Sequence, residues 1–229
     1  MMKMETLNDA NRQLIEATTE FVKNQLRDAE GGHDWWHIYR VWKLAKTIGK
    51  AEGADGLVVE LGALLHDIAD AKFNGGDETL GPEMTRQFLV DQGVDRKVID
   101  QVEAIVRDIS FKNTFGREVQ RTLELDVVQD ADRLDAMGAI GIARAFNYGG
   151  YQGNVMYDPQ LPPRVNMTKE EYKKGKSTTI NHFYEKLLLL KDKMNTDTGK
   201  RLAEARHQYM LTFLDTFYRE WEGGNSVVF

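Results

Sequence analysis

Cysteine is absent from this chain of 229 residues. A chain without cysteine forms no disulfide, no zinc–thiolate site and no thiol nucleophile, so proteins that depend on them are excluded. Long hydrophobic runs are also missing, because the longest aliphatic run, Leu187–Leu190, is far too short to cross a bilayer. No apolar run follows the first residues as it would in a signal peptide. We therefore expect a cytoplasmic protein with no membrane partner.

An excess of positive charge is lacking as well. The chain has 36 acidic and 30 basic residues, which gives a formal net charge of −6. Duplex nucleic acid is bound mainly by basic surfaces, so we expect no duplex nucleic acid partner. A local basic pocket for a small phosphate remains compatible with this charge. The 41% hydrophobic and 29% charged residues are typical of a globular chain that buries a sizeable core.

Proline is scarce, and three of the four prolines lie together between residues 159 and 163. Elsewhere apolar residues recur every three or four positions, which predicts amphipathic helices and an all-α fold. The predicted helices are 7–27, 33–51, 57–69, one that begins near Pro82, 95–109, 117–148, 168–193 and 198–221.

We expect a single helical domain over residues 1–229. Its core covers about 20–150, an irregular loop rich in glycine and proline covers about 149–167, and C-terminal helices cover about 168–222. These helices form a hairpin that packs on the core, because one face of it is apolar. That face is Phe183, Leu187, Leu190, Leu202, Tyr209, Phe213 and Phe217. The inward face predicted for helix 33–51 is Trp36, His37, Arg40, Val41, Leu44, Ala45 and Ile48.

Histidine and acidic residues meet in two otherwise apolar places. The first is His66-Asp67 within the segment GALLHDIAD, and the second is Asp130, Asp132 and Asp135 among valines and leucines. Burying such groups is costly unless they find partners. A divalent ion meets that need, since it binds neutral imidazole and neutralises carboxylates. The alternative is a buried polar network without metal.

The order of these residues resembles the H…HD…D signature of the HD-domain superfamily. His37, His66-Asp67 and Asp132 fall in segments that look like the family's own, namely HDWWHIYRVWKLA, LLHDIAD and DADRLDAMG. The resemblance covers about residues 20–150 and puts the last ligand at Asp132. Asp130 and Asp135 then become neighbours of the site. The later segments HFYEKLL and EW resemble one group of bacterial HD phosphohydrolases of undefined substrate.

The resemblance implies a helical bundle that holds one divalent ion, which could be Mn, Fe, Co, Ni or Mg. The implied ligands are His37, His66, Asp67 and Asp132. Dinuclear members of the family use further histidines between the HD pair and the final Asp. This chain has no histidine between His66 and Asp132. The sequence therefore predicts a single metal and disfavours oxygenase chemistry.

Other side chains take roles from their position relative to these ligands. Asp70 lies four residues after His66, where many HD hydrolases carry a Glu that orients or deprotonates the attacking water. Asp70 and Asp67 are the predicted catalytic residues, although Asp70 is one methylene shorter than that Glu. The predicted phosphate ligands are Arg40, Lys72, Lys112 and Arg133; Arg144 is a further candidate that could instead be structural. His33 and Asp135 are predicted to hydrogen-bond the ligands, His33 alternatively starting its helix.

These assignments predict a metal-dependent phosphohydrolase that cleaves a phosphate ester or anhydride of a nucleotide or related small metabolite. The alternative is a non-catalytic HD module that binds a nucleotide and signals to a partner. Mononuclear iron oxygenase chemistry is a third possibility. Trp35, Trp36 and Trp42 could stack on a base, but core packing is the predicted role of aromatics at this spacing. His182 and His207 are predicted to have ordinary structural roles.

Overall fold

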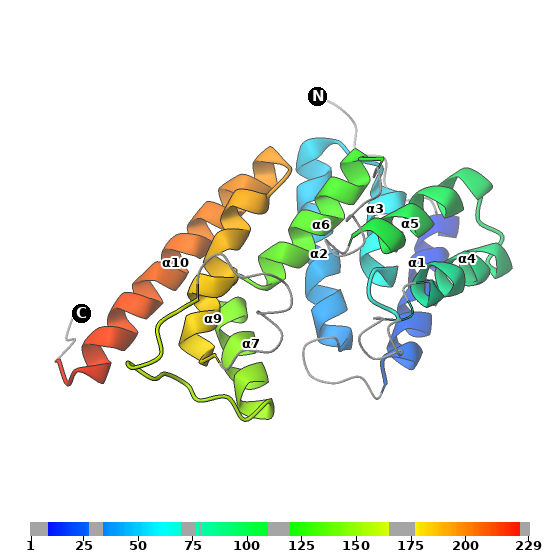
Figure 1. The fold of residues 1–229 in the computed structure, drawn as a ribbon. Helices are drawn as coiled ribbons and strands as arrows, with labels where there is room; N and C mark the ends of the chain where they lie inside the picture. The colour runs from blue at the N-terminus through cyan, green and yellow to red at the C-terminus, as the bar shows by residue number, and fades with distance from the viewer. Residues whose placement is uncertain are drawn as a thin grey trace. The chain divides into compact units, whose positions relative to one another are not determined.

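The computed structural model describes residues 9–27, 34–69, 77, 79–109, 120–164 and 177–224. Every regular element in these ranges is a helix, so the predicted all-α fold is confirmed (Figure 1). Within the same ranges, no helix is both long and apolar enough to span a membrane. The chain divides into two compact units, residues 1–132 and 133–229. The single domain over residues 1–229 stays a prediction.

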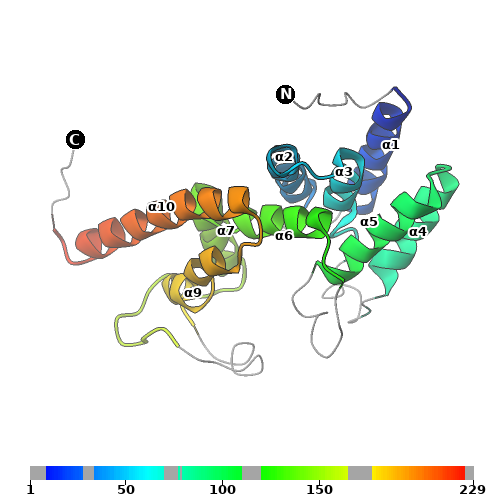
Figure 2. The same cartoon turned by 90° about the horizontal axis from the view of Figure 1, so that it is seen from above.

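The first unit is built around its third helix. Its elements are α1 (Asp9–Gln25), α2 (Trp35–Glu52), α3 (Gly56–Leu65), α4 (Leu80–Asp91), α5 (Arg96–Asp108) and the greater part of α6 (Leu123–Asp135). Helix α3 packs against α1, α2 and α5, while α4 packs against α5. Figures 1 and 2 both show α2 and α3 side by side.

The composition of α3 explains its central place. All residues from Val58 to Leu65 are buried, so this helix is covered on every side rather than along one stripe. Gly62 allows α5 to come close, since a Cβ at this position would lie 3.0 Å from Cδ1 of Ile105. The Asp55 side chain caps the first turn by accepting from the backbone N–H groups of Leu57 and Val58. His66, the residue that follows the last turn of α3, therefore lies in largely apolar surroundings.

A buried carboxylate ties α2 to α3. Glu60 accepts hydrogen bonds from the indole Nε1 of Trp42 and from Nζ of Lys46, each at 2.9 Å. The connection between the two helices turns at Gly53, which has the left-handed φ of 77° that glycine adopts without strain. The cap and the Glu60 contacts fix the relative placement of the two helices that carry His37 and His66.

The second unit has the elements α7 (Gly138–Tyr151), α9 (Thr179–Glu185), the 3₁₀ helix η2 (Leu187–Lys193) and α10 (Asp197–Trp221). Helix α10 packs on α7 and η2, and α9 packs on the same two elements. Figure 2 shows α7 and α9 beside α10. The predicted C-terminal hairpin therefore packs on α7, the last helix of the predicted core. Residues 152–164 contain no helix or strand, which agrees with the predicted irregular loop as far as it is described.

Two predicted helices are interrupted in the structure. The predicted helix 117–148 is wrong as one element, because α6 ends at Asp135 and α7 begins at Gly138. Met137 is extended there and Gly138 has a φ of 70°, a turn that helical periodicity does not reveal. The predicted helix 168–193 also breaks, at Lys186 (φ −145°, ψ −57°), into α9 and η2. Its first residues, up to 176, lie outside the described residues.

Two residues predicted to face inward are exposed. Trp36 is 61% exposed, although it precedes the buried His37. Successive residues in a helix point about 100° apart, so the stripe of α2 that includes His37 and Val41 leaves Trp36 outside. Tyr209 is exposed for the same reason, since its neighbour Met210 faces the interior.

Candidate metal centre

Helix α2 presents His37 at its first turn. Asp34 is the N-cap residue, and its carboxylate accepts a hydrogen bond from the backbone N–H of His37 at 2.9 Å. This cap satisfies one of the backbone N–H groups that have no partner within the helix at its start. The His37 side chain is buried, together with Val41 and Ala45 further along the same face. His37 is therefore a polar group on an apolar stripe.

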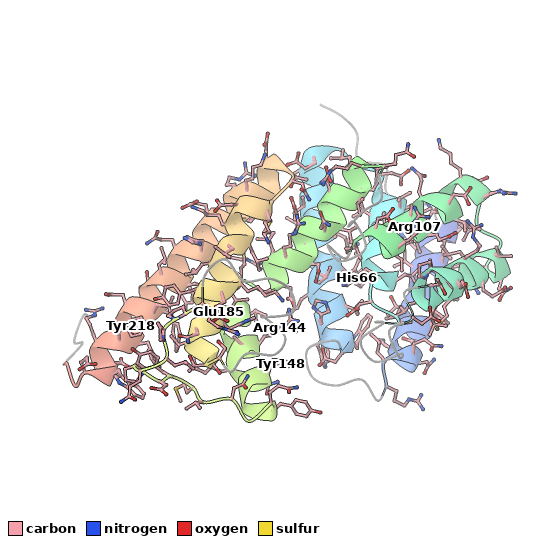
Figure 3. All side chains as sticks on the ribbon, viewed as in Figure 1. His66, Arg107, Arg144, Tyr148, Glu185 and Tyr218 are labelled. Carbon is pink, nitrogen blue, oxygen red and sulfur yellow. The ribbon has the colours of Figure 1, made fainter. Side chains whose placement is uncertain are left out.

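His66 closes α3, and its ring is held in one orientation (Figure 3). Nδ1 of His66 lies 2.8 Å from the carbonyl oxygen of Ala63. A carbonyl oxygen can only accept, so Nδ1 carries a proton, and in the neutral imidazole Nε2 then presents its lone pair. Nε2 is buried and has no hydrogen-bond partner among the described residues. This arrangement, a histidine fixed through one nitrogen with the other available, is typical of metal-binding histidines.

Asp132 on α6 brings a carboxylate to both histidines. Its Oδ1 lies 3.5 Å from Nε2 of His37 and 3.9 Å from Nε2 of His66. The two imidazole rings lie 5.3 Å apart between centroids and are inclined at 67°. One ligand atom from each of the three residues lies within 4.8 Å of the other two. The Asp132 side chain is 40% exposed, so the cluster is reached from solvent on the side of the carboxylate.

The donor set fits a divalent ion. Two imidazole nitrogens and a carboxylate oxygen are ligands that suit first-row transition ions, and no thiolate is available in the chain. The unpartnered Nε2 of His66 is the kind of buried acceptor that a cation satisfies. The described residues thus contain three of the four predicted ligands in one cluster.

The fourth predicted ligand, Asp67, is not a member of this cluster. It follows His66 directly, its side chain is half-buried, and it already has an interaction within the protein. Arg40 is half-buried one turn beyond His37. Asp70, Lys72, Lys112 and His33 lie outside the described residues.

Arg133 and Asp135, at the end of α6, contact other residues of their own unit, 133–229. The Arg133 guanidinium donates a hydrogen bond to the carbonyl oxygen of Lys193. Asp135 is buried and accepts a hydrogen bond from Nη1 of Arg144 at 2.6 Å. The structural role that the sequence left open for Arg144 is therefore the one observed, and Asp135 neutralises it.

The remaining described histidines have other surroundings. His182 lies in α9, where burial lowers its pKa to about 4 and the nearby Lys186 adds to the shift. His182 is therefore neutral at physiological pH. His207 lies in α10, and neither histidine belongs to the metal-like cluster of the described residues.

The sequence did not predict that the backbone carbonyl of Ala63 accepts a hydrogen bond from His66. It orients His66 from one turn earlier in the same helix, at a spacing of three residues. That spacing is a usable signal, because side chains in the last turn of a helix can reach the unpaired carbonyls there. Any histidine that closes an apolar helix can be examined for this contact.

Comparisons with known proteins identify the family of this chain. A family model described as the HD domain matches residues 35–137. The chain is 39% identical to the uncharacterized protein YpgQ of Bacillus subtilis over 205 residues, which cover 89% of this chain and 91% of the relative.

Solved structures are similar over nearly the whole chain. An HD-superfamily hydrolase from Bacillus thuringiensis has 42% identity and a TM-score of 0.75, with 93% of this chain and 98% of the other covered. The crystal structure of B. subtilis YpgQ in complex with ADP has 36% identity and a TM-score of 0.73, with 92% and 96% covered. The match to the family model and the similarity to these full-length relatives show that the chain belongs to the HD-domain superfamily of hydrolases.

Proposed function

We propose that this protein is a metal-dependent phosphohydrolase that cleaves a phosphate ester or anhydride of a nucleotide. The observation that carries the proposal is the buried lone pair of His66 Nε2, which faces Asp132 beside His37. In the proposal His37, His66, Asp67 and Asp132 hold one divalent ion. Asp67 joins the other three as the acid next to His66 in the sequence.

A divalent ion in such a site lowers the pKa of water and polarises a phosphoryl oxygen. The side chains of the protein are proposed to admit the substrate, accept a proton and orient the ligands. Asp132, the most exposed of the three clustered ligands, lies on the side from which a substrate enters. Asp70 is proposed to accept a proton from the attacking water. Hydrogen bonds from Nδ1 of His66 to Ala63 keep its ring from rotating while substrate exchanges.

Cationic side chains are proposed to hold the phosphate. Arg40 follows His37 by one turn of α2, which puts its guanidinium on the neighbouring face of that helix. Arg133 follows Asp132 in the sequence and donates a hydrogen bond to the carbonyl oxygen of Lys193. Lys72 and Lys112 complete the proposed set from the sequence. Charge-assisted hydrogen bonds of this kind stabilise the charge that develops on phosphoryl oxygens.

The nucleotide as substrate is supported by one relative. YpgQ of B. subtilis, 36% identical over 92% of this chain, has been crystallised in complex with ADP. The chain has a net charge of −6, whereas duplex nucleic acid is bound mainly by basic surfaces, so we favour a small phosphate compound over a polymer as the substrate.

The test combines metal analysis with a substrate panel. Purified protein is loaded with Mn, Fe, Co, Ni or Mg, and phosphate or pyrophosphate release is measured from nucleoside mono-, di- and triphosphates. We expect one ion per chain and turnover of at least one nucleotide. His66→Ala should lower both metal affinity and activity by at least about a hundredfold, since altering even the groups that support a metal ligand costs 10- to 100-fold.

His207→Ala is the matched control, because it removes a histidine from α10, outside the cluster. It should keep the metal and the activity. A wild-type protein that binds metal and nucleotide but turns over none of the panel would refute the enzyme and favour the non-catalytic module. If His66→Ala and His207→Ala lost metal binding and activity equally, the losses would reflect folding and not the metal site.

A further inference from the structure

The first turns of α2 carry two pairs of large aromatic side chains. Trp35 and Trp42 pack against neighbouring residues of the fold, whereas Trp36 and Tyr39 are exposed. Trp42 donates its indole N–H to the buried Glu60, and Nζ of Lys46 lies 5.2 Å from the ring centroid of Trp42. Trp35 is half-buried, with Nζ of Lys23 from α1 at 5.2 Å from its ring centroid. These two rings account for the core packing that the sequence predicted for aromatics here.

The other two aromatic rings of this group, Trp36 and Tyr39, face solvent. Trp36 is 61% exposed and Tyr39 is 36% exposed. Within the described part of residues 1–132, the other exposed large hydrophobic side chains are the aliphatic Val90 and Leu123. Among the described residues of the first unit, the exposed large aromatic side chains thus lie on the helix of His37. An exposed tryptophan next to a ligand-binding site indicates recognition more than stability.

The order of residues around α2 connects this surface with the metal-like cluster. With about 100° between successive residues, Arg40 lies about 60° from His37 around the helix, and Trp36 lies about 100° away on the same side. Trp36 and Arg40 are four residues apart and so are neighbours on the helix surface. Tyr39 is next, its ring 5.9 Å from that of Trp36 at an interplanar angle of 79°. A cation therefore lies between the cluster and the aromatic pair.

We propose that Trp36, supported by Tyr39, is the subsite on which the base of the substrate nucleotide stacks. This inference rests on the proposed function, because it takes a nucleotide as the substrate. The arrangement orders the parts of such a molecule: the phosphates at the cluster and Arg40, and the base against the exposed indole. Lys43 adds a second positive charge beside the aromatic pair, since its Nζ lies 5.8 Å from the ring centroid of Tyr39.

The expected size of the effect follows from base–aromatic stacking. Removing an aromatic platform typically weakens binding of a base by roughly 5- to 100-fold. Stacking is tolerant of sequence because every base has a π-face, so this subsite should raise affinity for nucleotides over base-free phosphates more than it selects among bases. Binding of pyrophosphate, which has no base, should not depend on Trp36.

The experiment measures dissociation constants of ADP and of pyrophosphate on the metal-loaded, full-length protein by equilibrium dialysis. Trp36→Ala should weaken ADP by roughly 5- to 100-fold and leave pyrophosphate within about twofold. Trp36→Phe keeps an aromatic face and should retain most of the affinity. Trp221→Ala, which removes an exposed tryptophan from α10, is the matched control and should change neither constant. Circular dichroism and light scattering check folding and molar mass for each variant.

The outcomes separate this subsite from the proposed hydrolysis. If the wild type binds ADP through Trp36 but releases no phosphate from any nucleotide, the subsite stands and the hydrolase proposal fails. If the wild type hydrolyses nucleotides but Trp36→Ala weakens ADP and pyrophosphate equally, or neither, the subsite is overturned. It is also overturned if the wild type binds no ADP, or if Trp36→Ala changes the molar mass while ADP binding is kept. That last result would make this face a protein interface. Should Trp36→Ala not fold, Trp36→Ser and Tyr39→Ser provide the same comparison.

Discussion

A buried glutamate in the second unit offers the most direct test of how this chain is held together. The side chain of Glu185 on α9, labelled in Figure 3, is 1% exposed. It accepts hydrogen bonds from the backbone N–H, Nε and Nη2 of Arg164, each at 3.0 Å. Its second oxygen also accepts from the Ser177 hydroxyl at 3.0 Å. Arg164 ends the described loop and Ser177 precedes α9, so one carboxylate joins the end of the loop to the segment that begins α9. The perturbation is Glu185→Ala.

The magnitude follows from these contacts. Removing one partner of a buried ion pair typically costs about 3–5 kcal/mol, because the other charge is left without compensation. The Arg164 side chain is 26% exposed, so water can recover part of its hydration in the variant. We therefore expect the free energy of unfolding of the second unit to fall by about 2–4 kcal/mol. In a chain of this size that corresponds to a melting temperature lower by about 4–16 °C.

The assay is thermal and urea unfolding of the full chain, followed by circular dichroism. Glu204→Ala is the matched control, since Glu204 pairs with Lys191 at 3.2 Å but is largely exposed. An exposed pair contributes about 0–1 kcal/mol, so this variant should melt close to the wild type. Glu185→Gln keeps the shape without the charge and should fall between the two. If Glu185→Ala is no less stable than Glu204→Ala, the argument that this carboxylate joins the two segments is wrong.

Three further predictions concern charge, backbone and metal. Burial alone would raise the pKa of Glu185, but hydrogen bonds from Arg164 and Ser177 lower it below its ordinary value. The ionised carboxylate therefore stabilises the fold above about pH 4.3, and this stabilisation is lost at lower pH. The stability difference between the wild type and Glu185→Ala should shrink as the pH falls through that range. Gly138→Ala should lower the free energy of unfolding by about 1–3 kcal/mol in urea titrations, because φ is +70° and the new Cβ would lie 3.1 Å from a side-chain carbon of Arg206; an unchanged midpoint would contradict this. Manganese at a hundredfold excess over its dissociation constant should stabilise the wild type by about 2.7 kcal/mol in thermal shift assays, and a shift of the same size in His66→Ala would place the ion elsewhere.

Most of the fold could be predicted because helix periodicity is a local signal. The helix predicted over 198–221 is observed as Asp197–Trp221, and 95–109 as Arg96–Asp108. The errors occur where tertiary contacts decide. The break before Gly138 leaves the apolar pattern uninterrupted, and the glycine there has a side-chain carbon of Arg206, nearly seventy residues later, against the position of its missing Cβ. Contacts at such separations are not encoded in a window of neighbouring residues.

The candidate site divides in the same way. The residues alone indicated His66-Asp67 and the acids between Asp130 and Asp135, because buried imidazoles and carboxylates need a partner. The resemblance to the HD-domain signature added His37 and chose Asp132, and three of the four ligands it implied lie in one cluster of the described residues. The partners of the flanking charges could not be read from sequence, since Asp135 is engaged by Arg144 only through the turn between α6 and α7. The exposure of Trp36 was missed because periodicity places a residue near an apolar stripe to within one position, and one position is about 100° of a helix.

The buried position of His66 lowers the stability of the metal-free fold. Helix α3 is buried from Val58 to Leu65, so any polar group at its end must be satisfied within the unit. Ala63 satisfies Nδ1, but Nε2 has no partner among the described residues, and a buried acceptor in that state costs about 1–3 kcal/mol. The Asp132 carboxylate cannot relieve this, because its oxygens are acceptors as well. Two acceptors that face each other across 3.9 Å are both stabilised by a cation between them, so the same arrangement that weakens the metal-free fold favours the metal-bound one.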